Sequence, residues 1–459
     1  MLLRHPEHPE RAVRLAYCQN LHPTEDFEGL LEGLRTISVP LAERLGVGEL
    51  KEGFGIGLWL PGDLALRLNT DSGSADLKRL SEFLASERLD AFTFNAFPYG
   101  GFHEAGLKER VFRPSWAAPE RLAFTLAVSA VALALRDNAE CGATDLTRAH
   151  VSISTHSGML ASWLKTGPDD LDETHVERAE CEENMAICAL HFAQVEDESD
   201  LRLILSVEPE PRSLAGDTSV LPELFERLML RAREVVGRNI DSLQEVSEAI
   251  IQRHVGTCLD ACHTAVEFEP VEAALANATS AGASLGKLQF SSALCLDDPA
   301  HNHAAREQLF AMDEPVYLHQ VTGRHPGGLL RALDLGELKS TWDQGPEPWA
   351  ACDQWRCHFH VPVDLAELPP AETEAPDAAS SPQSALATTR DHADQALLHT
   401  LAHPESWGTD ELHVEIETYT WNLLPGNARG SGDLVDGLER EYRHVLSLLA
   451  SAGWIVEKL

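Results

Sequence analysis

Short apolar runs alternate with longer segments of helical periodicity along most of this chain. The runs that predict strands lie at residues 13–18, 54–60, 91–97, 151–154, 201–207, 255–259, 286–290 and 412–417. Apolar residues at helical spacing lie at 26–46, 76–88, 119–136, 177–195, 221–236, 242–251, 270–280 and 433–451. This alternation predicts an α/β fold, a (β/α)8 TIM barrel that forms one domain over residues 1–459. The alternative is a doubly wound open sheet, but no G-x-G-x-x-G motif follows the first strand.

The alternation breaks between the seventh and eighth predicted strands. We expect an insertion at 297–410, which contains two strand-like pieces, 316–322 and 355–363. Residues 368–388 are rich in Pro, Ala and Ser and have no apolar period. Because such a composition buries too little apolar surface to order the chain, we expect a disordered loop there.

Composition narrows the range of partners. The chain carries a formal net charge of −37, whereas nucleic-acid binding requires clustered Lys and Arg. The same charge disfavours docking on anionic lipid, and no apolar run is long enough to span a bilayer. The 9 cysteines include no C-x-x-C pair and are expected to be reduced. Since the first residues also lack the apolar core of a signal peptide, we expect a soluble, cytoplasmic protein.

Candidate chemistry begins in the stretch 254–267, HVGTCLDACHTAVE. Residues 255–259 are apolar or small on both faces, which is typical of a fully buried strand. The strand is followed by Asp260 and, one helical turn later, by His263. A carboxylate and an imidazole this close can share a divalent cation, which offsets the desolvation of the carboxylate. Equally, Asp260 could cap the next helix, with His263 hydrogen-bonded nearby.

Carboxylates also end two other predicted strands. Glu208 ends the row of strand five that faces the barrel interior, provided that the leucines of this strand pack against helices. In the last strand His413, Glu415 and Glu417 share one face. Two carboxylates there would repel each other unless a cation or a proton lies between them. We therefore expect Glu417, nearest the carboxyl end, to bind a metal and Glu415 to support it from one layer below.

The insertion adds two histidines. His358 and His360 alternate onto one face of a short strand, as two metal ligands would, or as two histidines on a solvated edge. We expect His360 to be the ligand, because it adjoins the turn at Pro362. The expected metal ligands are Glu208, Asp260, His263, His360 and Glu417. Hard oxygens with imidazole suit one divalent metal ion, which could be Zn, Mn, Mg, Co or Fe.

This set resembles the metal ligands of the xylose isomerase-like barrels, a superfamily that holds sugar isomerases, epimerases and endonuclease IV-type enzymes. Those barrels place Glu on strand five, Asp-x-x-His on strand six, His on or after strand seven and Glu on strand eight. The matching positions here are Glu208, Asp260, His263 and Glu417. Strand seven carries Gln289 where the family has His. The resemblance thus implies a smaller site, or one that His358 or His360 completes.

Further segments resemble one branch of this superfamily, the EboE-type metabolite traffic proteins. They are LAYCQNLHPTED (15–26), FNAFPYGGFH (94–103), LQFSSAL (288–294), YLHQVTGR (317–324), CHFHVPV (357–363) and VEIETYTWNLLPG (414–426). The resemblance spans most of the chain. It implies a place in a bacterial gene cluster linked to export or processing of secondary and terpenoid-type metabolites. Other proteins of that cluster are then possible partners.

The expected ligand is a small-molecule metabolite. Side chains near strand ends that are candidates to contact it are His22, Tyr99, His103, Gln289 and His358. The expected reaction is isomerisation or epimerisation next to a carbonyl, in which Glu208 or Glu417 shuttles the proton. The alternative is a barrel that binds and hands on a metabolite without turnover, which the missing strand-seven His favours. Endonuclease IV-like phosphodiester cleavage conflicts with the net charge of −37.

Overall fold

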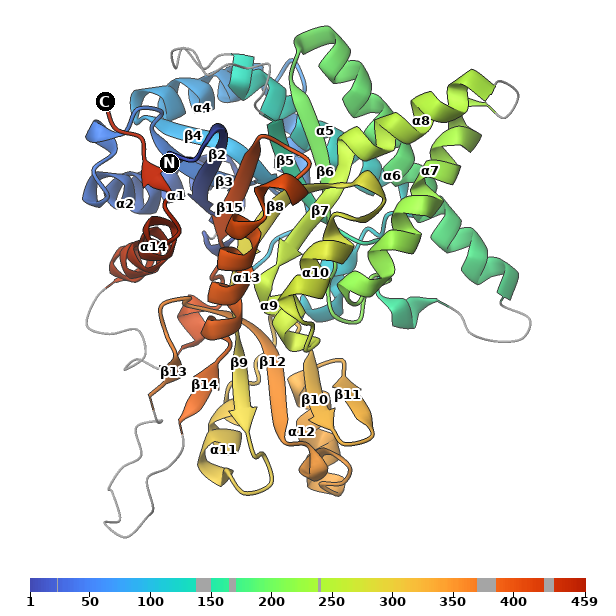
Figure 1. Cartoon of the computed structure of the whole chain (residues 1–459), viewed down its shortest axis with the longest axis vertical. Helices are drawn as coiled ribbons and strands as arrows, with labels where there is room; N and C mark the ends of the chain where they lie inside the picture. Colours follow the sequence, from blue (N-terminus) through green and yellow to red (C-terminus); the bar gives the residue numbers. More distant parts are fainter. Residues whose placement is uncertain (23, 138–149, 165–170, 238–240, 370–384, 425–432) are drawn as a thin grey trace.

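The structure is a computed structural model of the chain, and it describes all residues except 23, 138–149, 165–170, 238–240, 370–384 and 425–432. A large sheet with helices packed around it forms the main body, and a smaller sheet projects from one end of it (Figure 1). The two ends of the chain meet, because the first strand pairs with the last. The predicted α/β class is confirmed.

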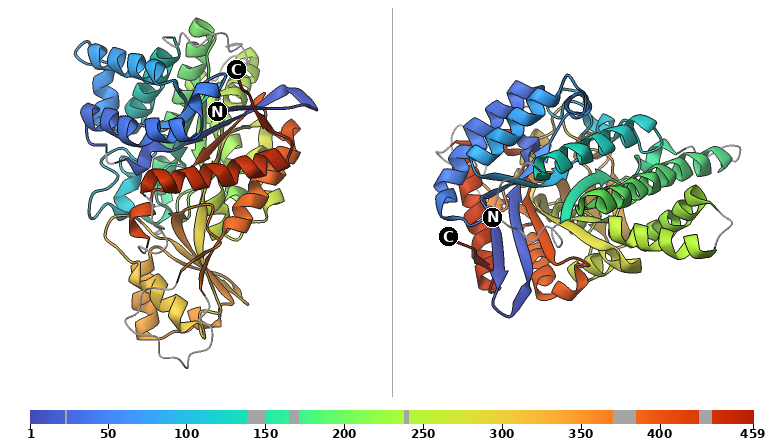
Figure 2. Two further views of the ribbon diagram at one scale, coloured as in Figure 1. Left: turned by 90° about the vertical axis from the view of Figure 1, so that its left-hand side faces the viewer. Right: turned by 90° about the horizontal axis from the view of Figure 1, so that it is seen from above.

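The large sheet has the strand order β16-β1-β2-β15-β8-β7-β6-β5-β4-β3. The bounds are β1 Leu2–His5, β2 His8–Tyr17, β3 Phe54–Trp59, β4 Leu89–Asn95, β5 His150–His156, β6 Arg202–Glu208, β7 Val255–Asp260, β8 Ser284–Phe290, β15 Glu411–Ile416 and β16 Ile455–Val456. Neighbours from β2 to β3 are parallel, whereas β1 and β16 add an antiparallel edge that was not predicted. The sheet curls (Figure 2), and a parallel bridge joins Cys18, just after β2, to Gly57 of β3.

Helices pack around this sheet (Figure 2). The bounds are α1 Phe27–Gly33, α2 Val39–Arg44, α3 Gly62–Leu68, α4 Ser74–Ser86, α5 Pro119–Asp137, α6 Leu171–Ser199, α7 Leu221–Val236, α8 Asp241–His254, α9 Ala261–Val266, α10 Val271–Ala278, α13 Arg390–Ala402 and α14 Leu434–Ser451. The prediction of a single helix at 26–46 is wrong in one respect. A π-helical segment, Leu34–Ser38, separates α1 from α2, where Pro40 lacks an N–H. No helix in the described part of the chain is long and apolar enough to cross a membrane.

The smaller sheet lies within residues 292–388 and has the strand order β11-β10-β12-β9-β14-β13. The bounds are β9 Ser292–Asp297, β10 Val321–His325, β11 Gly328–Ala332, β12 Gln354–Val361, β13 Glu367–Leu368 and β14 Leu386–Thr388, with α11 His303–Ala311 and α12 Leu335–Gln344 beside them. The chain therefore leaves the large sheet before residue 297. Of the loop predicted at 368–388, the last three residues form β14, and 370–384 lie outside the described residues.

The predicted strand faces are confirmed. Side chains of β6 and β15 that pack in the core between sheet and helices are Leu203, Leu205, Val207, Leu412, Val414 and Ile416. The alternate side chains point to the other face of the curled sheet, where strands approach closely. A Cβ at Gly286 would lie 2.0 Å from Ser206 Oγ. This inner face is therefore filled by few and mostly polar side chains.

A buried ion pair lies on the inner face, one layer below the strand ends. Lys287 Nζ is 2.5 Å from Glu415 Oε2, and neither side chain has any exposed surface. Gly57 leaves room for the carboxylate, because a Cβ there would lie 1.5 Å from Glu415 Oε1. Glu415 is thus one layer below Glu417 as expected, but its ion-pair partner is Lys287. Sequence reasoning missed this lysine because it took the strand as apolar.

Replacing Lys287 with Met should lower the free energy of unfolding by about 3–5 kcal/mol, because Glu415 would be left as an unpaired buried carboxylate. The double variant Lys287→Met/Glu415→Gln removes both charges and should recover most of that loss. Urea unfolding measures both. Lys51→Met, which breaks the half-exposed pair with Glu457, is the control and should change stability by about 1 kcal/mol at most. Equal losses for Lys287→Met and Lys51→Met would contradict the buried pair.

Candidate functional site

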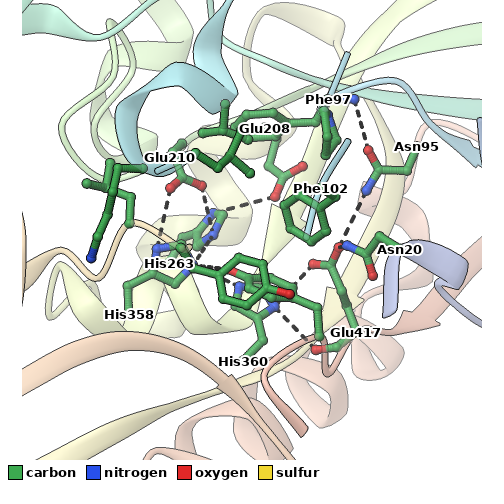
Figure 3. A pocket seen from close by; sticks show the side chains of 17 residues that line it. Asn20, Asn95, Phe97, Phe102, Glu208, Glu210, His263, His358, His360 and Glu417 are labelled. Carbon is green, nitrogen blue, oxygen red and sulfur yellow. Dashed lines mark hydrogen bonds and ion pairs between the residues drawn. The ribbon is translucent and has the colours of Figure 1, made fainter. Parts of the chain in front are cut away.

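The carboxyl ends of the parallel strands and one strand of the smaller sheet surround a cavity of about 50 Å³ (Figure 3). Its charged and imidazole lining includes Glu208, Glu210, His263, His358, His360 and Glu417. The strands that carry these groups are far apart in the sequence, but the carboxyl ends of parallel strands meet at one edge of a sheet. The lining therefore combines groups from β6, α9, β12 and the segment after β15.

Asp260 ends β7 and caps the short helix α9. Its Oδ1 accepts hydrogen bonds from His263 N–H at 3.0 Å and from Ser291 Oγ at 2.7 Å. The capping interpretation of this residue is therefore confirmed. Its Oδ2 is buried, has no hydrogen-bond partner among the described residues and lies 3.9 Å from His360 Nε2. One oxygen fixes the helix, so the other remains available to a ligand.

His263 lies between two glutamates. Its Nδ1 is 2.8 Å from the carbonyl oxygen of Pro209 and 3.6 Å from Glu208 Oε1, while its Nε2 is 2.9 Å from Glu210 Oε2. Glu208 Oε2 is buried without a hydrogen-bond partner in the described part of the structure. Sequence reasoning missed Glu210. The stretch Glu-Pro-Glu puts it two residues beyond Glu208, on the same face of an extended chain, and this spacing could have identified it.

His358 and His360 reach the cavity from β12, and both are buried. The alternative that they lie on a solvated edge is therefore wrong. His358 Nε2 lies 3.2 Å from His263 Nε2 and 2.9 Å from His360 Nε2. Nitrogen atoms about 3 Å apart have the separation of ligands that share one ion through bonds of about 2.1 Å. On the far side of its ring, His360 Nδ1 lies 3.2 Å from Glu417 Oε2.

Glu417 is held in place by three amides. Asn95 Nδ2 donates to its Oε1 at 3.4 Å. Asn20 Nδ2 donates to its Oε1, and Gln289 Nε2 donates to its Oε2. Gln289 lies near the carboxyl end of β8. Because its amide contacts a carboxylate of the cavity wall, Gln289 orients Glu417 and does not itself line the cavity.

Burial and charge act in opposite directions on Glu208 and His263. Burial raises the pKa of Glu208 well above its usual range; the charge of His263 opposes this rise, and the carboxylates of Glu417, Asp260 and Glu210 add to it. Burial would lower the pKa of His263, but Asp260 and Glu210 outweigh it and raise the pKa well above the usual range. In the absence of an ion, this half of the cluster therefore binds protons that a cation would have to displace.

In the other half of the cluster, Glu417 and His358 both have lowered pKa values. Burial would raise the pKa of Glu417, but His360 and Gln289 outweigh it and hold this pKa below its usual range. Burial, together with His263 and His360, lowers the pKa of His358 well below its usual range. Glu417 is thus ionised and His358 is neutral, which are the forms in which these groups bind a metal.

Of the side chains expected to contact a metabolite, His358 lines the cavity. Those that do not line it are His22, Tyr99, His103 and Gln289. Tyr99 packs edge-on against Phe124 of α5. His103 Nδ1 is hydrogen-bonded at 2.5 Å to the hydroxyl of Tyr317, which does line the cavity. The sequence correctly predicts that these side chains lie near strand ends. It does not show which of them line the cavity and which pack behind its wall.

Buried His, Asp and Glu side chains form clusters that could hold a metal ion, with ligand atoms within 4.8 Å of one another. These clusters are Asp260–His263–His360, Glu208–Asp260–Glu417 and Glu210–His263–His358. They contain all of the predicted ligands. The unpaired oxygens of Asp260 and Glu208 and the mixed oxygen and nitrogen donors fit a divalent ion, although they do not identify which one. A separate cluster, His150–Glu411–His413, includes a carboxylate that Arg14 already binds.

No protein-family model matches this chain, and no curated protein matches it significantly. The geometry of the chain's own residues therefore carries the functional argument.

Protein produced in metal-supplemented medium should contain about one equivalent of a divalent metal by elemental analysis at neutral pH. Asp260→Asn and His263→Ala should each lose most of it, because each removes a ligand from the cluster. Cys295→Ser, a substitution of a buried cysteine in the smaller sheet, is the control and should retain the metal. Equal metal content in all three variants, or none in the unmodified protein, would contradict the metal site.

Proposed function

We propose that this chain is a divalent-metal-dependent isomerase or epimerase that transfers a proton next to a carbonyl of a small metabolite. The observation that carries the proposal is a buried cluster at the cavity, in which oxygens of Glu208 and Asp260 that lack a hydrogen-bond partner among the described residues lie close to three imidazoles. Burying so many ionisable groups is costly unless they are compensated by a cation or by protons. Perturbed pKa values in a cavity are also typical of catalytic sites.

We further propose that the scaffold is an eight-stranded barrel of the xylose isomerase-like type. Support comes from the parallel order β2-β15-β8-β7-β6-β5-β4-β3, in which each strand lies next to its sequence neighbour in the parallel series. The bridge between Cys18 and Gly57 supports closure, since it joins the two ends of that order. In such barrels the reacting groups lie at the carboxyl ends of the strands, and all the cavity carboxylates lie there.

Asp260, His263, His360 and Glu417 would hold the ion, with Glu208 within reach. When bound, the ion polarises the carbonyl and the neighbouring hydroxyl oxygen of a substrate. Glu208 carries the proton between the two carbons, because one of its oxygens has no hydrogen-bond partner among the described residues and burial raises its pKa, so that it can hold a proton. Glu417 is held ionised by its amide and imidazole partners and so contributes charge and position.

The metabolic setting is proposed from the segment resemblance alone. Similarity to the EboE-type metabolite traffic proteins favours a substrate from bacterial secondary metabolism and partners encoded in the same gene cluster. Cleavage of phosphodiesters in nucleic acid is disfavoured by the net charge of −37.

A second candidate is a barrel that binds and hands on a metabolite without turnover. The observation that favours it is Gln289, which replaces the strand-seven His of the resembling family with a group that only orients Glu417. The two candidates differ in one respect that can be measured. Only the enzyme exchanges protons with its ligand.

Exchange of carbon-bound protons with deuterated water tests this difference. Metal-loaded protein should catalyse deuterium uptake next to the carbonyl of at least one member of a panel of small α-hydroxy ketones, followed by NMR. Glu208→Gln should abolish the uptake and keep its metal, whereas Glu49→Gln, which alters an exposed carboxylate, should leave it unchanged. A ketone that binds without exchange in the unmodified protein would favour the carrier. Exchange that persists in Glu208→Gln would contradict the role of this residue.

A further inference from the structure

The cavity has two chemically different halves. The polar half is the floor, formed by the carboxylates and histidines described above, which are all at most 5% exposed. The other half is apolar and consists of Phe97, Pro98, Phe102, Leu107, Val111 and Leu318. Leu107 and Val111 are partly exposed. Apolar surface therefore leads from the buried polar floor towards the outside of the molecule.

Aromatic rings from three separate segments join the two halves. Phe102 lies 5.2 Å from Tyr317 and 5.0 Å from Tyr419, and the two tyrosine rings are 5.0 Å apart, measured between ring centroids. The Tyr419 ring stacks on His360 at 4.5 Å. Phe102 lines the same cavity as Glu208 and Glu417 (Figure 3). A flat or apolar group beside the floor would thus contact ring faces and edges.

The apolar half of the cavity offers few free hydrogen-bonding groups. The Tyr317 hydroxyl is bonded to His103 Nδ1, and the Tyr419 hydroxyl lies 3.3 Å from His358 Nε2. Lys108 is the one cation among the described lining residues that is not an imidazole, and its Nζ lies 2.8 Å from Asp334 Oδ2. A molecule that carried hydroxyl groups along its whole length would bury them here without partners, which is unfavourable.

Charge and size restrict the ligand further. A phosphate or carboxylate at the end of the ligand remote from the ion would lie against apolar side chains, and Lys108, which also lines the cavity, is already paired with Asp334. The cavity lined by both halves has a volume of about 50 Å³, whereas one water requires about 10–15 Å³ by such a measure. It therefore holds only one end of a ring-sized ligand. The rest of the ligand must extend along Leu107 and Val111.

We propose that the site takes neutral, amphipathic molecules, with a pair of oxygen atoms at one end and an apolar, ring-sized body at the other. This inference rests on the proposed function, because the oxygen pair is taken to bind the ion held at the floor. The apolar body lies against Phe102, Leu107 and Val111. Sugars and sugar phosphates, which are polar throughout, are poor ligands for such a site.

Three probes that share one metal-binding group test the proposal: acetohydroxamate, benzohydroxamate and phosphoglycolohydroxamate. Their affinities for metal-loaded protein are measured by calorimetry. Benzohydroxamate should bind at least about tenfold more tightly than acetohydroxamate, since its ring leaves water for an apolar wall. Phosphoglycolohydroxamate should bind more weakly than acetohydroxamate because of its charge.

Two variants test which residues cause the preference for benzohydroxamate over acetohydroxamate. Leu107→Asn/Val111→Thr makes the wall polar with little change in volume, and it should reduce the benzohydroxamate preference at least about threefold without changing acetohydroxamate affinity. Leu66→Asn, which alters an apolar residue that is 36% exposed and not among the lining residues, is the control and should leave the preference unchanged. A preference that survives in the double variant would overturn the assignment of the wall.

The outcomes separate this inference from the proposed function. Equal binding of acetohydroxamate and benzohydroxamate, or tightest binding of phosphoglycolohydroxamate, would overturn the amphipathic class while leaving the metal site intact. Failure of all three probes to bind protein that contains its metal would overturn both, because the shared oxygen pair would then not reach the ion.

Discussion

The site depends on the compensation of buried charge at one edge of the large sheet. Four carboxylates and three imidazoles lie within a few ångströms of one another, and each is at most 5% exposed. Carboxylates so close together cannot all be ionised unless positive charge lies between them. The raised pKa of Glu208 and the raised pKa of His263 are two expressions of this constraint, because both describe protons held where a cation would otherwise be. A divalent ion would satisfy the same groups without protons.

The smaller sheet takes part in this compensation. β12 supplies His358 and His360, and the segment before β10 supplies Tyr317 and Leu318. The insertion therefore contributes both imidazoles to the polar floor and apolar surface to the wall. Meanwhile Gln289, on the large sheet, orients Glu417. The large sheet thus contributes an amide at β8, whereas a strand of the smaller sheet contributes two imidazoles.

Much of this arrangement could be predicted from local patterns. The period of two along β6 and β15 separated the leucines of the core from Glu208 and Glu417, and the Asp-x-x-His spacing identified Asp260 and His263. These predictions needed only the geometry of one strand. The positions of Glu210 and Tyr317 depend instead on how loops and the second sheet fold back, which involves pairing between β9 and β12 across a long stretch of chain. Lys287 was missed because nothing local to its strand shows that it pairs with Glu415, which lies on β15.

The most direct test of the central claim is a crystal structure of metal-loaded protein with an anomalous difference map collected at the absorption edge of the bound metal. The account predicts a peak in the cavity, with ligand distances of about 2.0–2.3 Å to His263 or His360 nitrogen and to carboxylate oxygen of Asp260 or Glu417. A cavity that contains only water, with the histidines hydrogen-bonded to protonated glutamates, would contradict the account. So would an anomalous peak at His150 and His413 with none at the strand ends.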